Sequence, residues 1–375
     1  MILMLYLDNS ATTQIHPEVK EAMLPYLMEE FGNPSSKYYS VAENAKNAVK
    51  EARHSLASLI GAHDSEIIFT SGSTESNNMV IKGVADYYSN HGKHIITSKV
   101  EHPSILETCK YLEEKGFEVT YLDVDKYGRI DLADFEQQLR DDTILVSLIW
   151  GNNELGSLND MESISELCCK GNIFLHTDAT QIVGKIEMNL SDYPGITFLS
   201  CSGHKFHGPK GIGATFIRRD QYDILTKITP LLHGGGQEQG IRSGTLAVHN
   251  IVGLGKAAEI AEKNLKKNIK KLEDMESYVS LILKDKFNDQ IVFNHDTNHK
   301  IPGVLSVQFK GANNELLVKN LAPVMAVSTG SACSSSKPSH VLAAIGLSID
   351  QVRSTVRFSM SSFIEKKDLE IFKEL

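Results

Sequence analysis

The segment Ile196-Thr197-Phe198-Leu199-Ser200-Cys201-Ser202-Gly203-His204-Lys205-Phe206-His207-Gly208-Pro209 joins a short apolar run to a loop with a lysine between two histidines. The apolar run predicts a buried strand, and Ser202, His204 and Lys205 follow at its carboxyl end. A lysine beside an apolar strand can be partly desolvated, which favours its nucleophilic, neutral form. By itself such a lysine is more often a surface residue, so the rest of the chain must decide between the two.

Further short apolar runs surround this segment and alternate with longer amphipathic stretches such as 161–169. The pattern is typical of an α/β domain with a largely parallel sheet. Ligands of such sheets bind beyond the carboxyl ends of the strands. The predicted strands span 67–70, 94–98, 119–122, 144–150, 173–177, 196–201 and 213–217.

The sequence pattern changes after about residue 250. A long helical stretch, 252–287, carries lysines on its polar side, which a solvated helix face explains. Strand-like runs at 291–293 and 304–309 follow, with a closing helix from about residue 365. Since 375 residues exceed one ordinary core, we expect a large domain at 16–250. Residues 1–15 and 251–375 are expected to form a smaller α+β domain that carries the Cys333 loop.

Composition limits the class of protein. Hydrophobic residues make up 41% of the chain and charged residues 23%, as in soluble globular proteins. A net charge of −9 argues against direct nucleic-acid binding. No apolar run approaches the roughly 18 residues of a membrane span, and the apolar start at 1–7 predicts a strand rather than a signal peptide. We therefore expect a protein that binds neither membranes nor DNA.

The five cysteines indicate neither a disulfide framework nor a zinc site, because their number is odd and none forms a CxxC pair. A reducing cytoplasm fits this usage. Cys109, Cys168 and Cys201 lie in apolar or helical stretches and are interpreted as packing residues.

Cys333 differs, because it lies in the run Ser328-Thr329-Gly330-Ser331-Ala332-Cys333-Ser334-Ser335-Ser336. A lone cysteine in such a loop is usually exposed without a function. The small neighbours leave its sulfur uncovered and its backbone free to move. Together with Lys205, it suggests amine chemistry that ends on sulfur.

Two strand ends carry groups suited to a phosphorylated, heteroaromatic cofactor. In Thr70-Ser71-Gly72-Ser73-Thr74-Glu75-Ser76-Asn77, small residues open a helix, so backbone N–H groups and the hydroxyls of Ser73 and Thr74 can bind an anion. Asp178 follows another strand, where its carboxylate can pair with a protonated ring nitrogen, and Gln181 can reach the same ring. Taken alone, the first segment is equally well explained as a helix N-cap, and Asp178 is better explained as one.

Three more segments complete the set. His102 follows a strand end and can stack on a ring or carry a proton. Asn153 lies where it can fix a carboxylate, and the loop 234–245 has anion-binding capacity. A phosphate cup, a carboxylate for a ring nitrogen and a Schiff-base lysine, in this order, indicate a pyridoxal-phosphate site.

At this point the chain resembles the cysteine desulfurases of the class V aminotransferase group, in the NifS/IscS-like branch. The resemblance runs nearly end to end. It rests on the Ser-Gly-His-Lys segment with Gly-Pro-Lys-Gly, the triple-glycine loop and the cysteine loop, and on Tyr6-Leu7-Asp8-Asn9-Ser10-Ala11-Thr12-Thr13, Phe31-Gly32-Asn33-Pro34-Ser35-Ser36 and Val356-Arg357-Phe358-Ser359. It implies a fold-type I pyridoxal-phosphate-dependent transferase, active as a homodimer.

The resemblance also implies a role for each site residue. Lys205 would form the Schiff base, Asp178 would pair with the pyridine nitrogen, Gln181 would bond the phenolic oxygen, and His102 would stack on the ring. The phosphate would be held by Thr74, Ser202 and His204, with Thr245 from the second subunit. Asn153 and Arg357 would bind the carboxylate of L-cysteine, and Cys333 would accept its sulfur as thiolate, which leaves L-alanine.

The chain departs from the family pattern at two places, of which the first concerns the acceptor of the sulfur. Only four residues separate Cys333 from Pro338, a loop about two residues shorter than in housekeeping relatives. Such short loops resemble desulfurases of DNA-phosphorothioation systems, so the expected acceptor belongs either to such a DNA-sulfur-modification complex or to an iron–sulfur scaffold. Gln239 stands where relatives often have a basic residue.

Other readings remain open. A selenocysteine lyase or another fold-type I enzyme would share the cofactor site, and an inactive sulfur-transfer scaffold would share the fold. The complete set of Lys205, Asp178, His102 and Cys333 favours the enzyme.

Overall fold

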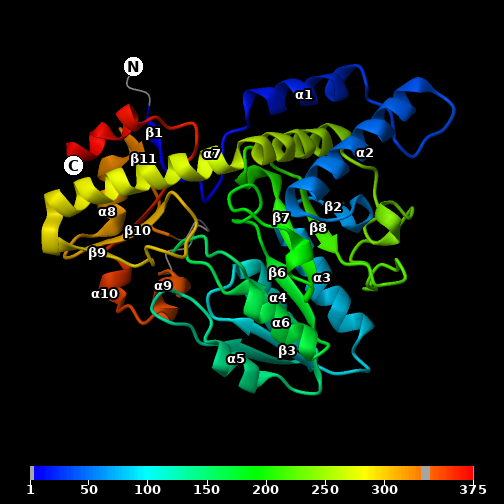
Figure 1. The fold of residues 1–375 in the computed structure, drawn as a ribbon, viewed down its shortest axis with the longest axis horizontal. Helices are drawn as coiled ribbons and strands as arrows, with labels where there is room; N and C mark the ends of the chain where they lie inside the picture. The colour runs from blue at the N-terminus through cyan, green and yellow to red at the C-terminus, as the bar shows by residue number, and fades with distance from the viewer. Residues whose placement is uncertain (1–3, 331–337, 375) are drawn as a thin grey trace.

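A seven-stranded sheet forms the centre of the computed structural model, which describes residues 4–330 and 338–374 (Figure 1). The strand order is β2-β8-β7-β6-β5-β3-β4. Strands β4, β3, β5, β6 and β7 run parallel, whereas β8 is antiparallel to both β7 and β2. The bounds are β2 Ile67–Thr70, β3 His94–Ser98, β4 Glu118–Leu122, β5 Thr143–Ile149, β6 Phe174–Asp178, β7 Ile196–Ser202 and β8 Gly213–Ile217.

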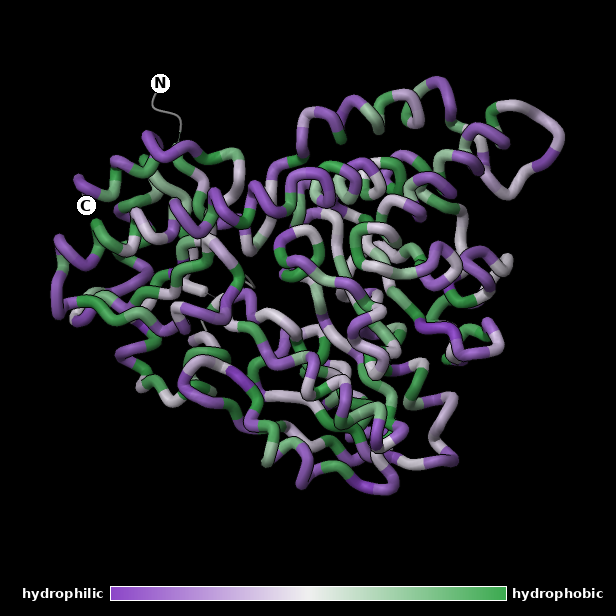
Figure 2. The backbone as a smooth tube through the Cα atoms, in the orientation of Figure 1, coloured by the Kyte–Doolittle hydropathy of each residue, from purple (hydrophilic) through white to green (hydrophobic). Residues whose placement is uncertain are grey.

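Helices cover both faces of this sheet, because alternate strand residues point to opposite sides. Ile67 and Phe69 of β2 join a core with α2 and the first half of α7, whereas Ile68 joins a core with α3 and α4. Figure 2 shows hydrophobic residues concentrated along the interior strands. The helices are α1 Pro17–Met28, α2 Ser40–Ile60, α3 Ser73–Tyr87, α4 Pro103–Glu113, α5 Leu132–Gln138, α6 Met161–Lys170 and α7 Val248–Phe287.

A second set of elements follows α7. Strands β12 (Thr355–Ser359), β10 (Val304–Phe309) and β9 (Ile291–Phe293) form an antiparallel sheet. The first strand, β1 (Leu5–Tyr6), pairs in parallel with β11 (Met325–Ala326), so the chain start lies beside its last third. Three short helices complete this part: α8 Asn314–Leu321, α9 His340–Ala344 and α10 Ile349–Val352.

Helix α7 contributes to two hydrophobic cores, that on one face of the large sheet and that of the C-terminal elements. Its first half packs Leu254 and Ala258 against the large sheet, and its second half packs Met275 and Val279 against β10 and β12. Figure 1 shows this helix running along both groups of elements. The predicted division at residue 250 therefore falls just inside the start of one continuous helix, and the domain division itself stays a prediction.

The expected strands of the large sheet agree with the observed ones to within about one residue, and the largely parallel sheet is confirmed. The strand expected at 1–7 is shorter, since β1 spans only Leu5–Tyr6 in the described part of that segment. The long helix begins four residues earlier than expected. The expected closing helix is a 3₁₀ helix, η6 (Lys366–Lys373). No helix within the described residues is long and apolar enough to cross a membrane.

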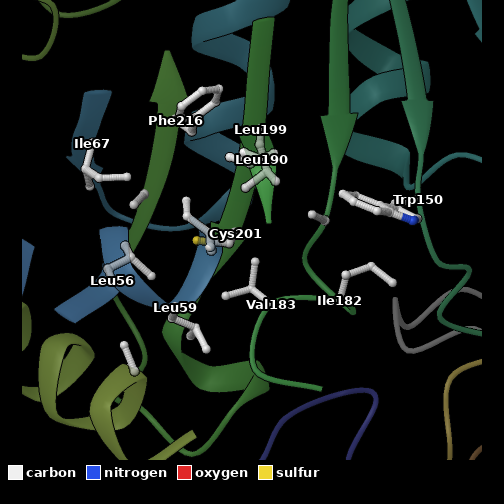
Figure 3. Close-up of a cluster of buried hydrophobic side chains, with 14 of the residues drawn as sticks. Leu56, Leu59, Ile67, Trp150, Ile182, Val183, Leu190, Leu199, Cys201 and Phe216 are labelled. Atoms are coloured by element: carbon white, nitrogen blue, oxygen red, sulfur yellow. The ribbon is translucent and has the colours of Figure 1, made fainter. Parts of the chain in front are cut away.

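Three cysteines are packing residues, as expected. Cys109, Cys168 and Cys201 are buried, and burial raises the pKa of each thiol to about 12. Figure 3 shows Cys201 in a cluster with Leu56, Val183 and Leu199. These thiols are therefore poorly suited to act as nucleophiles.

Candidate active site

A cavity of about 260 Å³ lies at the carboxyl ends of β6 and β7, where the sheet topology brings several loops together. The carboxyl edge of a parallel sheet is the usual ligand site of such folds. Eight of the predicted site residues line this cavity: Ser73, Thr74, His102, Asn153, Asp178, Gln181, His204 and Lys205.

Lys205 ends a single 3₁₀ turn, η3 (Gly203–Lys205), directly after β7. Its Nζ donates to the carbonyl oxygens of Ser10 at 2.7 Å and Ala11 at 2.8 Å. These acceptors come from the N-terminal segment, about 195 residues away in sequence. These two backbone oxygens therefore hold the amine at the cavity wall.

Asp178 is the last residue of β6 and is almost completely buried. Its Oδ2 accepts from Asn77 Nδ2 at 2.9 Å, and its Oδ1 accepts from the backbone N–H of Thr180 at 3.0 Å. Two donors thus orient the carboxylate at the cavity. A carboxylate fixed in this way is suited to hold a proton on a ring nitrogen.

His102 is the N-cap of α4, and hydrogen bonds fix which of its ring nitrogens carries the proton. Nδ1 accepts from the backbone N–H of Ser104 at 3.2 Å and lies 2.8 Å from Ser104 Oγ. Asn77 Nδ2 donates to that hydroxyl at 2.9 Å, so the hydroxyl hydrogen is available for Nδ1. Burial lowers the pKa of His102. The imidazole is therefore neutral, with its N–H on Nε2.

The predicted anion-binding end of the cavity is the first turn of α3. Its N-cap, Gly72, has φ +152° and offers no side-chain cap, so the N–H groups of the first turn point into the adjoining hollow. Ser202 and His204 line the same hollow with Ser73 and Thr74. Burial, then Lys205 and Lys210, lower the pKa of His204 to about 4, so its ring is a neutral partner.

Arg357 lies behind the cavity and is 1% exposed. Its Nη2 donates to Asp8 Oδ1 at 2.6 Å, and its Nη1 donates to the carbonyl oxygens of Asn153 at 2.9 Å and Gly330 at 3.1 Å. Nε has no partner within the described residues. Its predicted role in binding a carboxylate stays a prediction, and it requires Arg357 to exchange some of these contacts.

One further described site residue does not line this cavity. Thr245 is exposed and lies outside its lining. Cys333 and the segment 334–337 lie outside the described residues. Gln239 lies away from the cavity and has φ +57°. Its Oε1 accepts from Arg219 Nη2 at 2.6 Å, and its Nε2 donates to the carbonyl oxygen of Ser65 at 2.8 Å.

Four polar residues around the cavity were missed as site residues; three of them are buried and the fourth, Lys185, is half-buried. Glu101 accepts from Ser98 Oγ at 2.6 Å and from the N–H of Ile149 at 2.9 Å, and burial raises its pKa to about 8. Glu154 accepts from Ser339 Oγ at 2.5 Å. Asn77 and Lys185 are the others. The sequence signal that could have identified Glu101 and Glu154 is that each lies next to a predicted site residue, His102 and Asn153.

The donor set fits pyridoxal phosphate. A helix N-terminus with hydroxyls lies at one end of the site, a doubly oriented carboxylate lies at β6, and a lysine lies between them. The hydroxyl of Thr180, next to Asp178, is buried without a partner within the described residues. Thr74, Ser202 and His204 would hold the phosphate, Asp178 the ring nitrogen, Gln181 the phenolic oxygen and Lys205 the aldehyde carbon.

Comparisons with known proteins agree with this reading. Residues 5–372 match the family model described as aminotransferase class-V. The chain is 44% identical to "Cysteine desulfurase IscS" of Escherichia coli O139:H28, over 100% of this chain and 92% of that protein. It is similar to a solved "NIFS-LIKE PROTEIN" with a TM-score of 0.91 and 35% identity, covering 99% of this chain and 98% of the other. It is also similar to "SspA in complex with cysteine", with a TM-score of 0.82 and 38% identity, covering 95% and 99% of the two chains.

Proposed function

The chain belongs to the class-V aminotransferase family, and from that membership we propose that it is a pyridoxal-phosphate-dependent cysteine desulfurase. It converts L-cysteine to L-alanine and passes the sulfur to Cys333. The observation that carries the proposal is the convergence of Lys205, Asp178, Gln181 and His102 on one cavity. The resemblance noted from the sequence and the match to desulfurases agree with it.

The cofactor, when bound, supplies an electron sink for the Cα of the substrate. Asp178 would keep the ring nitrogen protonated, and the neutral imidazole of His102 lines the same cavity. Lys205, held beside the N-terminal carbonyls, carries the α-proton. Asn153 and Arg357 orient the substrate carboxylate.

Sulfur transfer is a single nucleophilic substitution at the sulfur atom of the substrate. The Cys333 thiolate attacks that sulfur, an S–S bond forms, and the substrate C–S bond breaks with its electron pair left on carbon. Protonation at carbon gives alanine, and Cys333 carries a persulfide. The role of Cys333 rests on the resemblance, since the residue lies outside the described structure.

The active unit is a homodimer. Apolar side chains are exposed on and just after α1, at Leu27, Met28 and Phe31. Contiguous exposed apolar residues of this kind are typical of interaction surfaces. Thr245 is exposed and does not line the cavity of its own chain, which supports a contribution to the site of a second copy.

The sulfur acceptor is a dedicated protein, either in a DNA-sulfur-modification complex or in an iron–sulfur scaffold, and the enzyme works in the cytoplasm. Support for a dedicated acceptor is the short tether of four residues between Cys333 and Pro338. Each residue spans at most about 3.6 Å, so a shorter tether requires an acceptor that docks close to the site.

The test of the proposed function is covalent trapping. Borohydride reduction of the purified protein should attach the cofactor to the peptide that contains Lys205, as detected by mass spectrometry. Lys205→Ala should lose this attachment and should release no alanine from L-cysteine. Trapping at another lysine, or alanine release by Lys205→Ala, would reject the assignment.

A further inference from the structure

Lys185 lies one turn beyond Gln181, in the compact turn that follows β6. The N–H groups of Ile182 and Val183 both donate to the carbonyl oxygen of Ala179, so the turn is helical. Lys185 Nζ consequently returns to Gln181 and donates to its Oε1 at 2.6 Å. Lys185 therefore contacts the predicted partner of the cofactor's phenolic oxygen.

The other end of the Gln181 amide faces Lys205. Gln181 Nε2 donates to the carbonyl oxygen of Ser10 at 2.9 Å, and the same oxygen accepts from Lys205 Nζ at 2.7 Å. An amide nitrogen has two hydrogens, so one remains for a ligand beside Lys205. An ammonium group can only donate, and it therefore requires Oε1 to face Lys185. If the Gln181 amide were flipped, its Nε2 would face the Lys185 ammonium, donor against donor. Its Oε1 would then face the carbonyl oxygen of Ser10, acceptor against acceptor.

The charge of Lys185 is not balanced by the protein. Within the described residues, no carboxylate pairs with it, and burial, then Lys205 and Arg357, lower its pKa to about 7. It also lines a neighbouring cavity of about 370 Å³, whose one described acidic residue, Glu365, pairs with Lys271 at 2.7 Å. An uncompensated cation at a half-buried site carries a desolvation cost. An anionic group bound beside Gln181 would offset that cost.

Gly184 keeps Lys185 close to the segment of Lys205. It has φ +77°, and a Cβ at this position would lie 2.9 Å from Phe206 Cβ. The turn can therefore pack against the residue after Lys205 only with glycine here. The close packing of Gly184 against Phe206 therefore fixes the position of Lys185 relative to the segment that carries Lys205.

We propose that Lys185 is a positioning residue of the cofactor site: it orients the Gln181 amide so that an N–H faces the phenolic oxygen, and its charge stabilises the anionic form of that oxygen. The proposal rests on the proposed cofactor chemistry. It assigns Lys185 no direct contact with substrate.

Three variants separate this role from a merely structural one. Lys185→Met keeps the side-chain length without donor or charge, and Lys185→Arg keeps both. Lys267→Met is the control, because Lys267 lines the neighbouring cavity from α7 without a hydrogen bond to Gln181. The measurements are the dissociation constant for pyridoxal phosphate and the pH midpoint of the visible absorption of the bound cofactor.

We expect Lys185→Met to weaken cofactor binding by about 10- to 100-fold, the range for a hydrogen bond to a charged group. The pH midpoint should move upward, because a cation beside an anionic oxygen is lost. Lys185→Arg should recover most of both effects, and Lys267→Met should change neither. In a Gln181→Leu background, Lys185→Met should weaken binding by less than about 3-fold, because its partner is already gone.

An unchanged midpoint in Lys185→Met, failure of Lys185→Arg to recover it, or full additivity with Gln181→Leu would overturn the proposal. These results are distinguishable from failure of the proposed function. If the unmodified protein does not bind pyridoxal phosphate at all, the cofactor assignment fails. If it binds normally and the lysine variants match it, only the role of Lys185 fails.

Discussion

Replacing Glu101 with glutamine should remove a pH-dependent loss of stability. Glu101 is completely buried, and only one of its oxygens is satisfied: Oε1 accepts from Ser98 and Ile149, while Oε2 has no partner within the described residues. Burial is the main cause that raises its pKa from 4.5 to about 8. The folded protein therefore keeps a proton here that the unfolded chain has already lost.

The sign and size follow from linkage. Between the two pKa values the folded state binds more protons, so the free energy of unfolding falls as pH rises, by about 1.4 kcal/mol per pH unit. The contribution is fully present below pH 4.5 and is lost as pH rises through about 8. From pH 6 to pH 8 the loss is about 2 kcal/mol. Glutamine cannot ionise, so Glu101→Gln should not show this loss in the free energy of unfolding.

The assay is urea unfolding at pH 6 and pH 8, at fixed protein and cofactor concentration. Trp150, the single tryptophan, is buried beside β5 and reports the transition by fluorescence. Glu66→Gln is the control, because both oxygens of Glu66 accept from backbone N–H groups, those of His63 and Arg219. Its stability relative to the unmodified protein should be the same at both pH values.

The stability of Glu101→Gln relative to the unmodified protein should rise by about 2 kcal/mol between pH 6 and pH 8. Equal pH dependence in the two proteins would refute the reasoning, and so would a rise of the same size in Glu66→Gln.

Three other predictions concern the site. Asp178→Ala should lose most desulfurase activity and retain cofactor poorly on dialysis, because the ring nitrogen loses its anion; near-normal alanine release would contradict this. Cys333→Ser should still bind cofactor but form no persulfide, and mass spectrometry that finds persulfide on Cys169 would assign the nucleophile elsewhere. Asp8→Ala should lower the free energy of unfolding by about 3 kcal/mol, because it leaves the buried Arg357 guanidinium without its carboxylate; Asp8→Asn, which keeps an acceptor, should cost less, and equal losses in urea unfolding would show that the charge is irrelevant.

The sheet was predictable because its strands are short apolar runs with clear ends. Ile67–Thr70, His94–Ser98 and Gly213–Ile217 lie where the sequence indicates, since buried strands need little beyond apolar side chains and polar boundaries. The start of α7 was misjudged, because Val248 to Ile251 carry no strong N-cap: its N-cap, Ala247, offers no side-chain oxygen.

Site residues next to a strand end were predictable from the strand, whereas their supports were not. Asp178 is the last residue of β6, and Lys205 ends the single turn that follows β7. Asn77, which orients Asp178 and contacts Ser104, lies inside α3, where an asparagine gives no sign of its partners. Lys185 resembles any polar residue of a turn, and only the fold shows its contact with Gln181. Contacts between distant segments depend on topology, which local patterns do not contain.

The N-terminal segment also has a consequence for the order in which the enzyme is made. Asp8 pairs with Arg357, Asn9 and Ser10 bond to Ser359, and the carbonyls of Ser10 and Ala11 hold Lys205. Segment 8–11 is therefore made long before residues 357–359, to which it is hydrogen-bonded. A nascent chain can fold its large sheet early, but the wall that holds Lys205 is complete only after residues 357–359 have left the ribosome. Reactive sulfur is therefore produced only by molecules in which these two distant segments have met.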